Sequence, residues 1–142
     1  MTIAEFVKRQ IPIYVSFGEN EHCDLIADFN GKLNRVQCKT SQIIKDNKLI
    51  WSISTTTTGV GGKATRYKYT KDDVDYFALY NIEANLLLLV SIDSILNDTY
   101  ISFNYPFKKN TNGAIAHNWE EFILEKVINM ESIISEDTET AC

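Results

Sequence analysis

The chain has 142 residues, of which 44% are hydrophobic, 23% charged and 11% aromatic, a composition typical of one globular domain that excludes a disordered or collagen-like chain. The longest apolar run, residues 86–90, is too short to span a bilayer and no signal segment follows Met1, so we expect a cytoplasmic protein that does not contact membranes. Seven of the 19 acidic but one of the 14 basic side chains lie at residues 120–142, so residues 1–119 have 13 basic and 12 acidic side chains and can still bind phosphate groups.

The first predicted elements are a short helix, an edge strand and a hairpin. Residues 2–9 have apolar side chains at helical spacing, which predicts a helix. Residues 11–17 alternate loosely and contain a proline, which favours a strand at the edge of a sheet. Residues 23–29 and 33–40 are extended segments on either side of Asn30-Gly31, a dipeptide typical of the two-residue turn of a β-hairpin because both residues tolerate positive φ.

Further strands are predicted in the middle of the chain. Residues 49–54 predict a strand, whereas residues 55–65, rich in threonine and glycine without periodicity, predict a loop. The apolar runs at residues 74–80 and 86–92 are separated by a polar stretch. They predict two strands, of which at least one is buried on both faces.

A closing helix completes the predicted fold. From Asn118 as N-cap, acidic residues in the first turn and apolar residues at helical spacing predict an amphipathic helix. We therefore expect an α/β fold, a mixed sheet flanked by helices, as a single domain over residues 1–134. An acidic, frayed tail is expected at residues 135–142.

The predicted hairpin gathers polar side chains at one end. With a two-residue turn, residues equally distant from Asn30-Gly31 pair with each other, so Asp24 is opposite Gln37. Because strand side chains alternate between faces, Arg35 and Lys39 share the face of Gln37. An acid, an amide and an ammonium group are therefore expected to lie together.

The cysteines are expected to be reduced. Cys23 is opposite Cys38 by the same pairing, on the more apolar face, where both would fill the core. With Cys142 the count is odd, and no CxxC spacing occurs. Neither a disulfide scaffold nor a zinc ribbon is supported.

The gathered side chains suit phosphodiester hydrolysis, which needs a hard divalent cation held by oxygen ligands. Asp24 can supply the charged ligand, Gln37 an amide oxygen and Cys38 its backbone carbonyl, while Lys39 can orient the attacking water and offset developing negative charge. The alternative from spacing alone is an ordinary ion pair of Asp24 and Lys39 on a solvated strand face.

The run from Gly18 to Thr40 resembles the signature of the PD-(D/E)XK nuclease superfamily, and more narrowly that of the group I intron-associated homing endonucleases, in which Gln replaces the second acid. The pattern of an Asp, twelve residues and Gln-x-Lys fits Asp24, Gln37 and Lys39. Residues 69–78 resemble the family's stretch before a central strand. The resemblance implies a restriction-endonuclease-like fold and Mg²⁺- or Mn²⁺-dependent cleavage of duplex DNA. Because two strands must be cut, we also expect a homo-oligomer, a dimer or a tetramer.

One departure from the family concerns the first helix, where the family has a Gly-Glu pair whose acid often contributes to the metal site. Glu5 is the nearest substitute, at a shorter spacing from Asp24. Two alternatives therefore stay open. One is a Holliday junction resolvase or DNA repair nuclease acting on branched DNA; the other is a catalytically inactive, nuclease-like module that binds DNA or protein.

The densest basic stretch is a candidate DNA contact. Lysine and arginine alternate there with Tyr67 and Tyr69, after a glycine-rich segment. Lysines contact phosphates, and an arginine in a groove can discriminate bases. The alternative is a solvated hairpin whose tyrosines support the sheet. The predicted DNA-binding residues are Arg35, Lys63, Arg66, Lys68 and Lys71.

Overall fold

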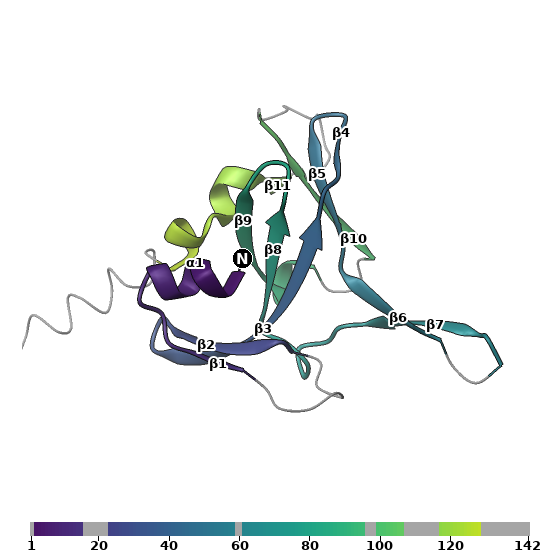
Figure 1. Ribbon diagram of the computed structural model, residues 1–142, viewed down its shortest axis with the longest axis horizontal. Coiled ribbons are helices and arrows are strands. Elements are labelled where there is room, and N and C mark those ends of the chain that lie inside the picture. Colours follow the sequence, from purple (N-terminus) through teal and green to yellow (C-terminus); the bar gives the residue numbers. More distant parts are fainter. Residues whose placement is uncertain (1, 16–22, 59–60, 96–98, 107–116, 129–142) are drawn as a thin grey trace, which may run out of the picture.

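The computed structural model describes residues 2–15, 23–58, 61–95, 99–106 and 117–128. Helix α1 spans Thr2–Lys8. A five-stranded sheet follows the order β1-β2-β3-β8-β9 (Figure 1). Its strands are β1 (Ile13–Val15), β2 (Leu25–Phe29), β3 (Lys32–Ser41), β8 (Tyr76–Asn81) and β9 (Leu86–Ser91).

Two smaller sheets accompany the five-stranded one. The four-stranded sheet has the order β11-β10-β5-β4, and β6 pairs with β7 in a separate hairpin. Short 3₁₀ turns span Ile92–Ser94 and Trp119–Phe122, and residues 124–128 are helical. The bounds are β4 (Ile44–Lys45), β5 (Lys48–Ser52), β6 (Ser54–Thr58), β7 (Ala64–Lys68), β10 (Tyr100–Asn104) and β11 (His117–Asn118).

The five-stranded sheet is mixed, as predicted. Strands β3 and β8 are parallel, whereas β1–β2, β2–β3 and β8–β9 are antiparallel. The proline-containing segment forms β1, which is at the edge as expected because proline lacks the N–H that a central strand needs. Among the described helices, none is long and apolar enough to cross a membrane.

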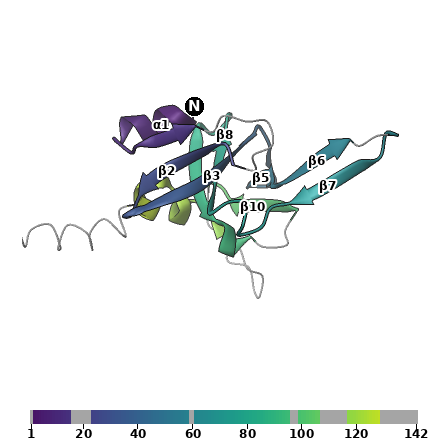
Figure 2. The same cartoon turned by 90° about the horizontal axis from the view of Figure 1, so that it is seen from below.

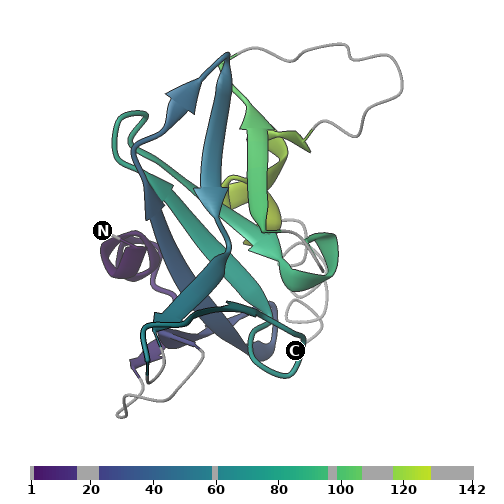
Figure 3. The same ribbon diagram turned by 90° about the vertical axis from the view of Figure 1, so that its right-hand side faces the viewer.

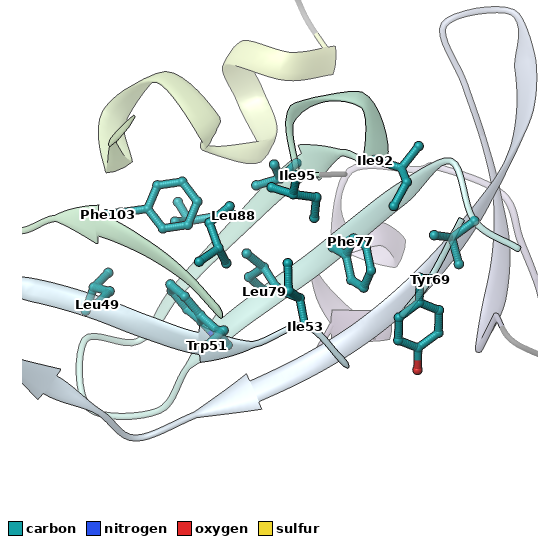
Figure 4. Packing of buried hydrophobic residues seen from close by; sticks show 13 residues of the cluster. Leu49, Trp51, Ile53, Tyr69, Phe77, Leu79, Leu88, Ile92, Ile95 and Phe103 are labelled. Carbon is teal, nitrogen blue, oxygen red and sulfur yellow. The ribbon is translucent and has the colours of Figure 1, made fainter. Parts of the chain in front are cut away.

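Two apolar cores lie on opposite faces of the five-stranded sheet. The inter-sheet core joins it to β5 and β10, and includes Trp51, Phe77 and Phe103 (Figure 4). The helix-side core lies under α1 and includes Phe6 and Leu124. Figure 3 shows α1 on one side of the sheet and the β5–β10 layer on the other. The sheet is thus covered by helical residues on one face and by strands on the other.

Strand β8 is buried on both faces, as predicted. Phe77 and Leu79 face the inter-sheet core, and Ala78 between them faces the helix-side core. This follows from the two-residue period of a strand. The indole Nε1 of Trp51 donates to the Tyr80 carbonyl at 3.0 Å, a hydrogen bond that links β5 to β8.

Two predicted elements are wrong. Residues 55–65 were expected to form a loop, but β6 and β7 form a hairpin that projects from the body (Figures 1 and 2). Threonine is β-branched and favours strands even without alternation. The final helix was expected to begin directly after Asn118 as its N-cap, but Trp119–Phe122 is a 3₁₀ turn and Ile123 forms a bridge with Leu88, so α-helical residues begin at 124. Residues 129–142, including the predicted tail, lie outside the described residues.

The β2–β3 hairpin has the predicted turn, and its register agrees with the prediction as far as Leu25 and Val36. Asn30 has a φ of 57° and Gly31 a φ of 70°, the positive values of a type I′ turn. The described pairs run from Phe29 opposite Lys32 to Leu25 opposite Val36.

We expect Gly31→Ala to lower the free energy of unfolding by about 1 kcal/mol, because an alanine resists positive φ. A Cβ at this position would meet no atom within 4 Å, so the cost is conformational and not steric. Urea unfolding measures it, with Lys32→Ala, an exposed neighbour, as the control. Equal stability of Gly31→Ala and the wild type would contradict the turn assignment.

Candidate active site

The candidate site begins where β2 ends. The N–H of Asp24 donates to the Val36 carbonyl at 3.0 Å, although Leu25 already pairs with Val36. Asp24 and Leu25 therefore both lie opposite Val36, which is a β-bulge. The prediction that Asp24 is opposite Gln37 is thus wrong, because the two-residue turn fixes the register only up to Leu25. Beyond it, the Asp24 Oδ2 atom accepts the backbone N–H of Cys38 at 2.8 Å. The carboxylate thus accepts the hydrogen bond that a backbone carbonyl of a longer β2 would have accepted.

The backbone carbonyl of Cys38 points to the same side. The carbonyls of Arg35 and Ser41 accept from Asp75 and Ile82, on the β8 side of β3. Hydrogen-bonding direction alternates along a strand, and both polar groups of one residue share a direction. The N–H and C=O of Cys38 therefore face the β2 side, where Asp24 lies.

The bulge also changes the predicted placement of the cysteines. Cys38 packs against the helix-side core, as expected, but Cys23 packs against the inter-sheet core. The two thiols therefore do not share a face, because one extra residue in β2 reverses the alternation before it. Burial, reinforced by the Asp24 charge, raises the pKa of the Cys38 thiol to about 11. Cys38 is thus a neutral core side chain at physiological pH.

Lys39 lies on β3 next to Cys38, and its side chain is half-buried. Burial lowers the pKa of Lys39, and the nearby negative charge of Asp24 partly opposes this effect. The Lys39 Nζ atom lies 5.1 Å from the centroid of the Tyr69 ring. Gln37 and Lys39 are two residues apart on one face of β3. The bulged end of β2 therefore lies beside the stretch of β3 that contains Gln37, Cys38 and Lys39.

Glu5 is engaged elsewhere. Its carboxylate forms ion pairs with Arg9 at 2.7 Å and Lys8 at 3.4 Å on α1. Arg9 also bonds Glu125, and this arginine lowers the pKa of both glutamates. Among the contacts of the described residues, none joins Glu5 to Asp24.

Arg35 forms a clamp between β3 and the turn before β8. Its Nε and Nη2 atoms donate to the Asp75 carboxylate at 3.2 and 3.3 Å, and its backbone N–H donates to the same carboxylate at 2.9 Å. Nη2 also donates to the Lys71 carbonyl at 2.7 Å, and Nη1 to that of Asp72. The guanidinium is thus used within the protein. Asp75 had no signal in the sequence, because its partner lies 40 residues away.

The remaining predicted DNA-binding residues lie on or near the projecting hairpin β6–β7, which we call the arm. Lys63, Arg66 and Lys68 are exposed. Lys71 lies after the arm and forms an ion pair with Asp93 at 2.6 Å. The basic side chains of the arm are exposed, as a DNA contact requires. Tyr69, just beyond β7, is buried in the inter-sheet core, as expected for a tyrosine that supports the sheet.

The predicted metal ligands are of the chemical type that a hard divalent cation binds. They are the Asp24 carboxylate, the Gln37 amide oxygen and the Cys38 carbonyl, and oxygen ligands are those that Mg²⁺ and Mn²⁺ prefer. Within the described ranges there is no group of three or more His, Cys, Asp or Glu side chains that could hold a metal ion. The set is poor in charge, which weakens metal affinity relative to two carboxylates.

A family model described as PD-(D/E)XK endonuclease matches residues 1–122. The match covers most of the chain, and the chain belongs to the PD-(D/E)XK endonuclease family. The solved structure of a bacterial homing endonuclease has the same fold, with a TM-score of 0.68 and 17% identity over 96% of this chain and 90% of that chain. No curated protein sequence matches the chain.

The clamp predicts a pH-dependent stability. Burial raises the pKa of Asp75, but the hydrogen bonds from Arg35 outweigh it, so the pKa is lowered on folding. A lowered carboxyl pKa stabilises the fold at neutral pH, and this stabilisation is lost as the pH falls through the lowered value. We expect Asp75→Asn to lower the free energy of unfolding at pH 7 by about 1–2 kcal/mol, the range for a charge-assisted pair that is partly exposed.

Urea unfolding at pH 7 and at about pH 3 measures this effect, because the carboxyl group approaches protonation in this range. The difference between wild type and Asp75→Asn should shrink at the lower pH. Asp72→Asn is the control, since Asp72 contacts Arg35 through its backbone carbonyl. A difference independent of pH would contradict the clamp.

Proposed function

We propose that the protein is a Mg²⁺- or Mn²⁺-dependent endodeoxyribonuclease that cleaves duplex DNA in the manner of a homing endonuclease. Family membership supports nuclease chemistry. The single observation that supports the assignment of the site is the hydrogen bond from the Cys38 N–H to Asp24, because it holds the carboxylate at the β3 backbone between Gln37 and Lys39.

In this proposal each side chain has a separate task. Asp24, Gln37 and the Cys38 carbonyl would hold the cation, which when bound polarises the scissile phosphate and stabilises its charge. The Lys39 ammonium would orient the attacking water by hydrogen bonding and offset the negative charge that develops on the phosphate. Its half-buried position strengthens this interaction, because fewer water molecules screen it.

We further propose that the arm contacts DNA. A two-stranded ribbon fits the major groove, and the arm extends well beyond the cores in two perpendicular views (Figures 1 and 2). Lys63 and Lys68 would contact phosphates, whereas Arg66 could also reach a base edge. Lys71 and Arg35, also predicted to bind DNA, would contribute less, because each forms an ion pair with an aspartate. A homo-oligomer, a dimer or a tetramer, would supply a second site for the second strand.

One observation favours a second candidate, an inactive module that binds DNA or protein. The ion pairs of Glu5 with Arg9 and Lys8 leave Asp24 as the single carboxylate of the proposed donor set. A junction resolvase or repair nuclease would use the same residues on branched DNA. Comparing linear and branched substrates separates this alternative from homing-type cleavage.

We expect cleavage of plasmid DNA to require a divalent cation and to be abolished by a chelator. Lys39→Ala and Asp24→Asn should each lower the rate by about 10² or more, because each removes a group that acts on the developing charge. Gel assays of supercoiled plasmid measure both.

Lys32→Ala and Asp28→Asn remove the same charges elsewhere in the β2–β3 hairpin and are the matched controls. Cleavage at the wild-type rate by either site variant would refute the site. Absence of cleavage by the wild type with either metal would favour the inactive module.

The arm should determine the salt dependence of binding. Replacing Lys63 or Lys68 by alanine should lower affinity for all sequences alike and reduce the slope of log K against log salt by about 1 for each phosphate that the variant protein no longer neutralises. Fluorescence anisotropy with duplex DNA at several salt concentrations measures the slope. Lys45→Ala, an exposed lysine on β4, is the control. Unchanged slopes in both arm variants would exclude the arm from the interface.

A further inference from the structure

We propose that Tyr69 is a positioning residue that holds the Lys39 ammonium group in the active site against the face of its ring. This inference rests on the proposed function, because it assigns a support to the lysine that acts on the phosphate. The distance of 5.1 Å from Lys39 Nζ to the ring centroid is within the range of a cation–π contact. Tyr69 is 9% exposed, so the ring is part of the core rather than a mobile surface group.

The ring is itself held by aromatic neighbours. Phe77 packs against it edge-to-face at 5.3 Å and 85°, and Tyr67 does so at 5.9 Å and 86°. Figure 4 shows Tyr69 beside Phe77 at the margin of the inter-sheet core, with its hydroxyl directed away from the cluster. Phe77 is opposite Gln37 in the parallel pairing of β3 and β8. The aromatic group therefore lies against the strand that contains the catalytic lysine.

The turn after Tyr69 is also anchored. The Asp73 carboxylate accepts the N–H of Thr70 at 2.8 Å and the hydroxyl of Tyr67 at 2.9 Å. The Arg35 clamp holds the following residues against β3. Tyr69 is thus fixed from both sides along the chain, and its position relative to β3 is determined by contacts that do not involve Lys39.

A lysine in this position needs such a support. Its ammonium is a compact charge on a flexible four-carbon chain, and ordering that chain costs rotamer entropy. The electron-rich face of an aromatic ring attracts the ammonium and replaces part of the hydration that a half-buried group has lost. The ring therefore restricts Lys39 to one region while its N–H groups stay available for water and phosphate.

The position of Tyr69 also connects Lys39 to the arm. Strand β7 ends at Lys68, so the ring is on the residue directly after the basic strand. One short stretch of chain thus contains both the proposed phosphate contacts and the support of the proposed catalytic lysine.

The first test is independent of catalysis and uses the full chain without metal. Protons above an aromatic ring are shielded, so the Lys39 ε-methylene signals in a ¹H–¹³C spectrum should lie upfield of those of exposed lysines such as Lys45. Lys39→Arg assigns the signal. Tyr69→Phe should keep the shift, and Tyr69→Leu should abolish it. An unshifted Lys39 signal in the wild-type protein would overturn the proposal even if Tyr69→Leu failed to fold.

The second test is kinetic. We expect Tyr69→Leu to lower kcat by about 10-fold to 10²-fold with KM within about 3-fold of wild type, because a misplaced catalytic group reduces the rate and not substrate affinity. Tyr69→Phe should restore kcat to within about 3-fold of wild type. Phe103→Leu, which removes another fully buried ring from the same core, controls for general destabilisation.

The outcomes separate this inference from the proposed function. Cleavage that survives Lys39→Ala refutes the proposed site, whatever Tyr69 does. Cleavage that is abolished in Lys39→Ala but keeps the wild-type kcat in Tyr69→Leu refutes the positioning role alone. Equal decreases in Tyr69→Phe and Tyr69→Leu would also overturn it, because the hydroxyl and not the ring would then be the active element.

Discussion

The hydrogen bond from the Cys38 N–H to the Asp24 carboxylate is the contact on which the candidate site depends. A strand that stops early leaves the polar groups of its neighbour without a backbone partner. Here a side chain accepts the N–H that the missing backbone would have bound, so one hydrogen bond extends the end of the hairpin and holds the carboxylate at the backbone between Gln37 and Lys39. The hairpin and the proposed metal site therefore share the Asp24 carboxylate.

The part of the candidate site that could be predicted from the sequence is the β2–β3 hairpin, because it depends on residues that are close together in the chain. The turn dipeptide Asn30-Gly31 acts on its immediate neighbours, so it predicted both the hairpin and its pairing up to Leu25 and Val36. The bulge at Asp24 could not be predicted, because it is defined by a backbone hydrogen bond from Asp24 to Val36 and not by any alternation of residue types. That single extra residue is also why Cys23 was assigned to the wrong face.

Long-range pairing accounted for most of what could not be predicted. Strand β5 pairs with β10, so that Ser52 is opposite Tyr100, and nothing in either segment identifies the other. The arm was mistaken for a loop because its threonine- and glycine-rich segment has no apolar periodicity to detect. The contact of Asp75 with Arg35 and that of Tyr69 with Lys39 also join residues that are far apart in the sequence. The β3–β8 pairing brings these segments together.

The parallel pairing of β3 and β8 also bears on how the protein reaches its fold. Residues 42–75 separate the two strands, and β4 to β7 within that segment belong to other sheets. Closing so long a connection costs chain entropy before any contact between the two strands offsets it, whereas the β2–β3 hairpin closes over a two-residue turn. Asp24 is held at the end of this local hairpin. Tyr69, whose ring lies near Lys39, precedes the strand that closes the long connection. The two halves of the proposed site therefore rely on contacts of very different sequence separation.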